Sequence, residues 1–281
     1  MPIERNIPVH RLLIASLKRG FQILDQQAQQ EIIQFLKQSQ HESGGFTDRA
    51  SYPDLYYSLF GLWLSQACDQ HELLDGLNQY QEIQSEENLA PVEQMALILI
   101  RNELNPSKKR RSLLSVFMTL FQKGKNIGLS YRFFLFTLVV ESVGKHIHMG
   151  FYYFFVSLFL FFYRPKTDYP CSLLAALLYA RKRVGLRFKK EQRQLLEYSI
   201  DSGGFRAFHH VKNSDMLSTG VALFALSETN TDLRLLKPAT LDFIQENFAE
   251  GAFLSGDGDL TRDLEYTFYG LLALGSLVKD K

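Results

Sequence analysis

The chain contains Gly251-Ala252-Phe253, followed by Asp263 and the apolar run Leu264–Leu274, and this pattern occurs three times. The two earlier copies have the same components in the same order: Gly44-Gly45-Phe46, Asp54 and Leu55–Leu62; then Gly203-Gly204-Phe205, Asp215 and Met216–Leu223. Each copy follows a segment with helical character and places an Asp before an apolar helix. A repeated unit of this kind indicates an array of like supersecondary units, so it decides the fold before any other feature.

The physical logic of the repeat is local. The first glycine is expected to take the left-handed cap position after a helix, and the second to let the backbone fold back closely. The Phe should then fill the gap in the core. The Asp should cap the next helix by accepting a hydrogen bond from a free N–H group. A small residue in the second turn of that helix is expected to let neighbouring helices approach: Gly61, Ala222 and Gly270.

Apolar spacing along the rest of the chain predicts about twelve helices and no convincing strand. The expected helices are 11–24, 27–38, 54–68, a short one within 69–90, one from 91, 111–122, 131–143, 151–163, 172–181, 190–200, 215–226, 236–248 and 263–278. Such helices form about six hairpins, which must stack on neighbours to bury their apolar faces. We therefore expect an all-α, single-domain α/α toroid over residues 1–281, a closed ring with one helix of each hairpin inside.

Composition is that of an ordinary globular protein, with 46% hydrophobic and 22% charged residues, although 23 Phe is a high number. Cys68 and Cys171 make neither a disulfide framework nor a metal-binding spacing, which fits a reducing compartment. The N-terminal residues lack a signal-peptide pattern, and the longest apolar run, Met149 to Tyr163, is too short for a membrane span. We expect a cytoplasmic protein, with peripheral membrane attachment as an alternative.

The net charge of +1 conceals an asymmetry, because residues 108–193 carry seventeen Lys or Arg against three acids. Clusters at Lys108–Arg111 and Arg181–Arg183 flank aromatic segments at Phe133–Phe136 and Phe151–Phe155. The basic residues could contact an anionic membrane or an acidic protein, or form a solvated face. No groove-reading motif is present, so nucleic acid is not expected as a partner. The aromatic residues could pack the core or line a cavity for a long apolar chain.

The repeat, above all its third copy, resembles that of protein prenyltransferase β-subunits, a family that also includes squalene and terpenoid cyclases. The resemblance implies an α/α toroid with a deep aromatic cavity for an isoprenoid. It does not carry the catalytic zinc over. In the family, zinc is held by an Asp, a Cys two residues later and a His; Asp215 matches the Asp, but Leu217 and Tyr266 occupy the other two positions. We therefore expect no metal and no cofactor. His146 and His148 are two residues apart, so on a helix they would point in different directions.

The cyclase branch needs a buried acid of raised pKa, and the nearest candidate, Asp257-Gly258-Asp259, is expected to be a solvated turn. The prenyltransferase diphosphate site carries over in part. Its basic positions, six and three residues before the zinc Asp, are His209 and Lys212, with His210 adjacent. An exposed polar loop is the alternative interpretation of these residues.

The sequence therefore predicts that the chain binds an isoprenoid or similar lipid-like molecule, most favourably its diphosphate, in a central aromatic cavity. The candidate substrate-binding residues are Tyr57, His209, Lys212, Asp215 and Tyr266. If the chain is an enzyme, the reaction is zinc-independent prenyl transfer or terpenoid cyclisation. The alternative is a non-catalytic protein-interaction module that kept the toroid fold and lost the chemistry.

Overall fold

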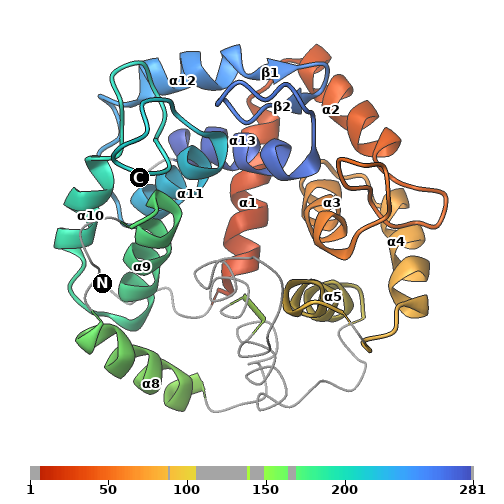
Figure 1. Cartoon of the computed structure of the whole chain (residues 1–281), viewed down its shortest axis with the longest axis horizontal. Coiled ribbons are helices and arrows are strands. Elements are labelled where there is room, and N and C mark those ends of the chain that lie inside the picture. Colours follow the sequence, from red (N-terminus) through yellow and green to blue (C-terminus); the bar gives the residue numbers. More distant parts are fainter. Residues whose placement is uncertain (1–6, 88, 106–137, 140–148, 164–168, 280–281) are drawn as a thin grey trace. The chain divides into compact units, whose positions relative to one another are not determined.

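A computed structural model describes residues 7–87, 89–105, 138–139, 149–163 and 169–279 (Figure 1). The described chain is mainly α-helical, which confirms the all-α prediction. It forms two compact units. Of the described residues, unit 1 contains 15–32, 150–163 and 169–279, and unit 2 contains 7–14, 33–87, 89–105, 138–139 and 149. The unit boundaries fall within α1 (Val9–Gln22) and α2 (Gln26–Gln38).

The described part of unit 2 holds the first repeat and three helices: α3 (Leu55–Ala67), α4 (Glu72–Ile83) and α5 (Pro91–Leu104). The apolar helix α3 packs against α5 and α4. Glu103 near the end of α5 accepts from His10, with Nε2 and Oε2 3.4 Å apart. Prediction of these helices from apolar spacing was correct to within a few residues.

Unit 1 holds the second and third repeats. Its further elements are α8 (Met149–Phe162), α9 (Cys171–Val184), α10 (Lys189–Leu196), α11 (Met216–Glu228), α12 (Lys237–Glu246), β1 (Phe248–Ala249), β2 (Ala252–Phe253) and α13 (Leu264–Leu277). The sequence did not predict the two short strands. They pair antiparallel with Phe248 opposite Phe253. The two residues between them, Glu250 and Gly251, have φ of 47° and 81°, as a tight hairpin turn requires.

All three repeats begin their apolar helix with an Asp cap, as predicted. Asp54 accepts from the N–H of Tyr57 at 2.9 Å, and Asp263 accepts from the N–H of Tyr266 at 2.8 Å. Asp215 accepts from the N–H of Ser218 at 2.9 Å. Each cap has extended backbone and satisfies donors that the first turn of a helix leaves open.

A second shared contact fixes the Phe of each repeat. The backbone N–H of Phe46 donates to the hydroxyl of Ser58 at 2.8 Å. The equivalent bonds run from Phe205 to Thr219 at 2.9 Å and from Phe253 to Thr267 at 3.3 Å. The acceptor is always four residues after the capping Asp, so one turn of helix holds both the cap and the Phe.

The small residue of the repeat has a different role from the one predicted. A Cβ added at Gly61 would lie 2.3 Å from the ring of Phe46, and one added at Gly270 would lie 2.3 Å from the ring of Phe253. These glycines therefore admit the Phe ring of their own repeat, not a neighbouring helix. Close approach of backbones occurs elsewhere: a Cβ at Gly220 of α11 would lie 2.6 Å from a carbonyl oxygen of α13.

The first glycine of each repeat has the positive φ that the sequence predicted, but it lies in a turn and not at a helix cap. Gly44 has φ of 89° and its N–H donates to the carbonyl of His41, six residues past the end of α2. Gly203 has φ of 96° and forms the same turn with Ile200. A side chain there would strain the backbone and would collide with a carbonyl of a neighbouring helix, that of Gly76 in α4 or of Ala239 in α12.

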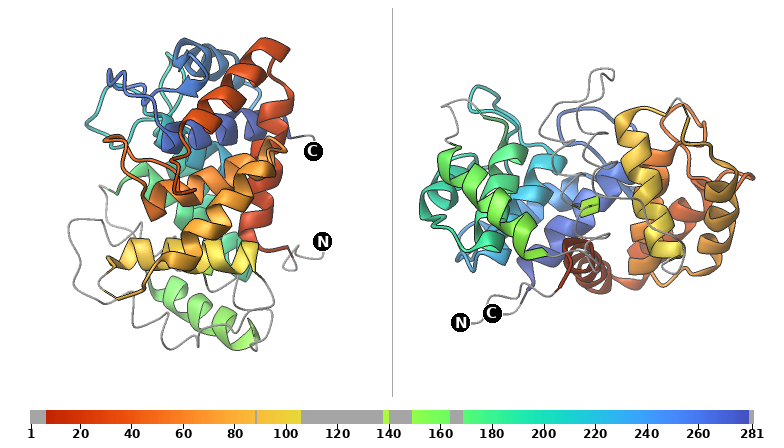
Figure 2. Two further views of the ribbon diagram at one scale, coloured as in Figure 1. Left: turned by 90° about the vertical axis from the view of Figure 1, so that its right-hand side faces the viewer. Right: turned by 90° about the horizontal axis from the view of Figure 1, so that it is seen from below.

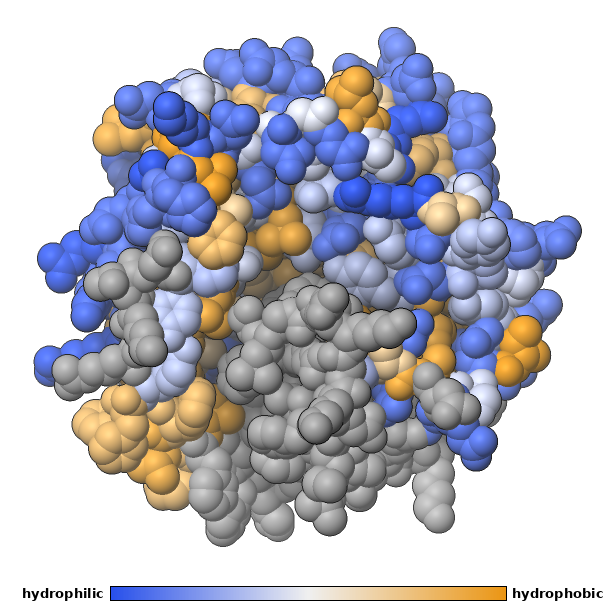
Figure 3. Space-filling model, viewed as in Figure 1, coloured by the Kyte–Doolittle hydropathy of each residue, from blue (hydrophilic) through white to orange (hydrophobic). Residues whose placement is uncertain are grey.

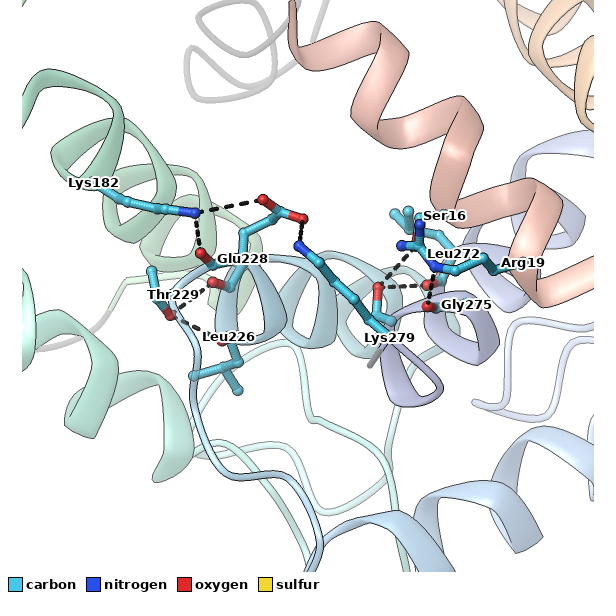
Figure 4. A network of polar contacts seen from close by, with 11 residues as sticks. Ser16, Arg19, Lys182, Leu226, Glu228, Thr229, Leu272, Gly275 and Lys279 are labelled. Carbon is cyan, nitrogen blue, oxygen red and sulfur yellow. Dashed lines mark hydrogen bonds and ion pairs between the residues drawn. The ribbon is translucent and has the colours of Figure 1, made fainter. Parts of the chain in front are cut away.

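Within unit 1, helix α11 packs against both α9 and α13 (Figure 1, Figure 2). At their carboxyl ends the buried carboxylate of Glu228 lies between two lysines, 3.5 Å from Nζ of Lys182 and 2.6 Å from Nζ of Lys279 (Figure 4). Lys182 also donates to the carbonyl of Glu228. Two cations at this end offset both the carboxylate and the negative ends of the helix dipoles.

The N-terminal helices contribute to the same unit. A Cβ at Gly275 of α13 would lie 1.8 Å from the carbonyl oxygen of Ser16 in α1, so the two backbones touch there. Arg19 Nε donates to the carbonyl of Gly275 at 3.2 Å (Figure 4). Gly251 of the third repeat makes a similar backbone approach to Glu31 of α2. Residues 15–32 of the first two helices thus pack on the last repeat.

Candidate ligand-binding site

The loop between Phe205 and α11 carries the basic residues singled out in the sequence. The ring of His209 packs on Tyr198, with centroids 4.0 Å apart, and His210 stacks on Phe208 at 5.4 Å. Arg206 fastens the loop, since its guanidinium donates to the carbonyls of His209 at 3.3 Å and Glu197 at 2.9 Å. The loop is thus held by aromatic packing and by one arginine.

Three cationic or protonatable side chains of this loop are exposed. They are His209, His210 and Lys212. The carboxylate that follows these residues in the sequence, Asp215, caps α11. The loop can therefore present a basic surface to an anion from solution, in agreement with the exposed polar loop that was the alternative interpretation.

Asp215 is committed to capping α11. Its Oδ1 accepts from the N–H of Leu217 at 3.2 Å, and its Oδ2 accepts from the N–H and the hydroxyl of Ser218. Burial raises the pKa of Asp215, and the carboxylate of Asp257 raises it further, against these hydrogen bonds. The N–H of Met216 donates to the carbonyl of Ser255 at 2.7 Å. The first three N–H groups of α11 are therefore occupied, so a phosphate in this region would have to be held by side chains.

Cys171 lies close to the same helix end. Its Sγ is 3.9 Å from the carbonyl oxygen of Ser218, and its N–H donates to the carbonyl of Ala207 at 2.9 Å. The thiol is completely buried, and burial raises its pKa well above the usual value, with Asp215 adding to the effect. A buried neutral thiol is neither a nucleophile nor a ready metal ligand, so Cys171 is a packing residue.

Tyr57 and Tyr266 occupy equivalent positions three residues after the capping Asp of the first and third repeats. Both are half-buried, and both donate their backbone N–H to the cap. The corresponding residue of the second repeat is Ser218. Tyr266 belongs to unit 1 together with His209, Lys212 and Asp215, whereas Tyr57 belongs to unit 2.

The positions that hold zinc in the resembling family contain no second or third ligand here. Leu217 is apolar, and Tyr266 replaces the imidazole. Within residues 7–87, 89–105, 138–139, 149–163 and 169–279, no three His, Cys, Asp or Glu side chains are grouped to bind a metal ion. The pair His146 and His148 lies outside the described residues.

Asp257 and Asp259 form a loop of the third repeat. Asp257 is exposed, and the hydroxyl of Ser255, which donates to its Oδ1, lowers the pKa of this carboxyl group. A general acid for alkene protonation needs the opposite shift. The geometry supports the solvated turn that the sequence favoured.

A cavity of about 620 Å³ lies in unit 1, away from the basic loop. Its walls come from the α1–α2 turn, α2, α12, the β-hairpin and α13: Ile23, Leu24, Asp25, Gln27, Ala28, Glu31, Leu241, Ile244, Gln245, Phe248, Phe253 and Leu274. This volume is typical of small-molecule sites. Its polar lining consists of two carboxylates and two amides, so it suits a neutral or cationic apolar molecule better than a diphosphate.

Part of the predicted ligand region lies outside the described residues. This holds for Phe133–Phe136, for the basic cluster Lys108–Arg111 and for the expected helix 111–122. Helix α8 is described and covers most of the second aromatic segment. None of the helices in the described ranges is both long enough and apolar enough to span a membrane.

Comparison of the chain with protein-family models, with curated proteins and with solved structures gives no match. The residues that the sequence reasoning missed are the hydroxyl acceptors Ser58, Thr219 and Thr267. A signal for them was present, because all three repeats place Ser or Thr four residues after the Asp. The cavity had no such signal, because its walls come from segments more than two hundred residues apart in the sequence.

Proposed function

We propose that the chain is an α/α toroid of about six helical hairpins over residues 1–281 that binds an isoprenoid or similar lipid-like molecule, as diphosphate, in its interior. The observation that carries this proposal is the identical construction of the three repeats, each with an Asp cap, a buried Phe and a hydroxyl that holds the Phe N–H. The packing of α11 against both α9 and α13 is what neighbouring inner helices of such a ring require. The free, buried cysteines Cys68 and Cys171 fit a cytoplasmic location.

The basic loop supplies the anion-binding part of the proposal. Lys212 is exposed, and His209 is oriented by its packing on Tyr198. The carboxylate of Asp215 accepts hydrogen bonds from the N–H groups of Leu217 and Ser218. These donors partly offset its negative charge, so the carboxylate repels a nearby anion less strongly. The diphosphate would be held by Lys212 and His209, with the apolar tail directed toward the aromatic segments.

Binding without catalysis is the form of this function that the chemistry favours. The zinc positions contain Leu217 and Tyr266, the thiol of Cys171 is buried, and the pKa of Asp257 is lowered, whereas a general acid needs a raised pKa. A reaction would have to be a zinc-independent prenyl transfer or a cyclisation that relies on positioning alone.

The test is calorimetric titration of farnesyl and geranylgeranyl diphosphate into the full chain and into Lys212→Ala. Loss of one charge-assisted contact should weaken binding by about 1.5–3 kcal/mol, or roughly ten- to a hundredfold. Lys237→Ala at the start of α12 removes the same charge elsewhere and should bind as the wild type does. Binding that Lys212→Ala leaves unchanged would show that the basic loop is not the site.

A second candidate function is a non-catalytic protein-interaction module, and the use of all three Asp residues as caps favours it. Helix capping alone accounts for the Asp of each repeat, so no catalytic or ligand-binding role is needed to explain it. If neither diphosphate binds at high micromolar concentration, the ligand-binding proposal is rejected in favour of this module.

A further inference from the structure

Helix α8 presents an apolar face to solvent. Four side chains at helical spacing are largely exposed: Phe154 at 62%, Leu158 at 46%, Phe161 at 64% and Phe162 at 73%. We call these four residues the α8 face. Residues at i, i+4, i+7 and i+8 lie within one arc of a helix, so the face is continuous. Figure 3 shows it as a compact hydrophobic patch at the lower left of the molecule.

The opposite side of α8 is attached to unit 1. Leu160 is completely buried, and its carbonyl accepts from Nη1 of Arg181 at 2.8 Å. At the end of the helix the hydroxyls of Tyr163 and Tyr169 form a hydrogen bond of 2.8 Å. These contacts hold α8 beside α9 at the edge of unit 1 (Figure 2) and determine which side faces outward.

A strongly basic segment lies next to this helix. Arg181 Nε donates to the carbonyl of Arg187 at 2.9 Å, so one guanidinium joins α8 to the turn between α9 and α10. Residues 181–193 contain seven Lys or Arg and a single acid, Glu191. Four of these cations are exposed at the turn and along α10: Arg187, Lys189, Lys190 and Arg193.

We infer that the α8 face and the basic segment 181–193 together form a docking surface for the headgroup region of an anionic lipid bilayer. Exposed phenylalanines partition into the boundary between headgroups and acyl chains, while neighbouring Lys and Arg attract the negative surface potential. The charge of the segment selects this occupant, because a second copy of the same surface would place like charges together. The inference does not depend on the proposed ligand or on any chemistry in the basic loop 206–212.

Vesicle flotation of the full chain tests this surface. Vesicles of phosphatidylcholine with about 30% phosphatidylserine should capture the protein, and pure phosphatidylcholine vesicles should capture much less, because each basic residue gains from the anionic lipid. Binding should weaken at about 0.5 M salt, where the Debye length falls to a few ångströms.

Two variants separate the parts of the surface. Phe161→Ser with Phe162→Ser should reduce vesicle binding roughly tenfold or more, since two exposed rings no longer enter the bilayer. Arg187→Glu with Lys190→Glu should abolish the preference for phosphatidylserine. A matched control, Leu235→Ser, changes a side chain that is 97% exposed on a different segment and should bind as the wild type does.

Three results would overturn the inference. They are absence of binding to either vesicle, equal binding by the doubly substituted Phe variant, and equal binding to neutral and anionic vesicles. Light scattering on the same samples tests whether a second copy of the chain occupies the α8 face instead. A wild-type dimer that the Phe variant dissociates, together with no vesicle binding, would assign the face to that second copy.

Discussion

The hydroxyl that accepts from the Phe N–H of each repeat should be a measurable source of stability. In the second repeat, Thr219 Oγ1 lies 2.9 Å from the N–H of Phe205, and both residues are completely buried. Thr219→Val keeps the shape and the β-branch but removes the acceptor. The carbonyl of Asp215, to which the hydroxyl donates, also accepts the N–H of Thr219 and so keeps a partner. The substitution therefore leaves the N–H of Phe205 buried without an acceptor, which should lower the free energy of unfolding by about 1–3 kcal/mol.

Two measurements on this variant check the reasoning. Urea unfolding should show the loss of stability, and amide hydrogen exchange should be faster at Phe205. Thr219→Ser is the matched control, because it keeps the hydroxyl and removes a buried methyl worth about 0.8 kcal/mol. It should leave the exchange of the Phe205 amide close to that of the wild type. If Thr219→Val leaves this amide equally protected, or if the Ser variant loses as much stability as the Val variant, the hydroxyl is not what holds the Phe.

Three further changes test other parts of the structure. Gly270→Ala would place a Cβ 2.3 Å from the ring of Phe253, so the overpacking cost of about 1–3 kcal/mol should exceed the gain in helix propensity of about 1 kcal/mol, and urea unfolding should show a net loss. Glu228→Gln should lower the unfolding temperature, because its two half-buried lysine partners lose their counter-charge; an unchanged temperature at low salt would contradict this. Burial raises the pKa of Asp215, so the folded chain holds that proton more tightly than the unfolded chain does. The contribution of Asp215 to stability should therefore decrease as pH rises from the unfolded value of 3.8 through the raised folded value. In Asp215→Asn, urea midpoints against pH should lack this slope.

Much of the fold could be predicted because its signals are local. Apolar spacing gave α2 nearly to the residue, and Pro91 marked the start of α5. The Asp caps were predicted because a capping oxygen reaches only the first turn of its own helix. These features depend on neighbours within about one turn, so the sequence alone contains the information that they need.

The features that sequence reasoning missed depend on contacts between distant segments. Gly61 and Gly270 were expected to admit a helix, but each admits a Phe ring from fifteen or more residues earlier in the chain. The β-hairpin was missed because Glu250 supplies a positive φ that Asn, Asp or Gly would usually supply. The Lys–Glu–Lys cluster at Glu228 joins three helices, and no pattern within any one of them indicates it.

The capping role of the Asp in each repeat is independent of any chemistry beside it. In Asp215 both carboxylate oxygens accept hydrogen bonds from the first turn of α11, a role that needs no metal and no substrate. The same role falls to Asp54 and Asp263, where no catalytic ligand was expected. Loss of an Asp at this position should cost about 0.5–2 kcal/mol of stability, whether or not a reaction takes place beside it. Leu217 and Tyr266 each donate a backbone N–H group to the cap of their repeat. A function for this chain must therefore be argued from Lys212, His209 and the surfaces of unit 1, and not from the capping aspartates.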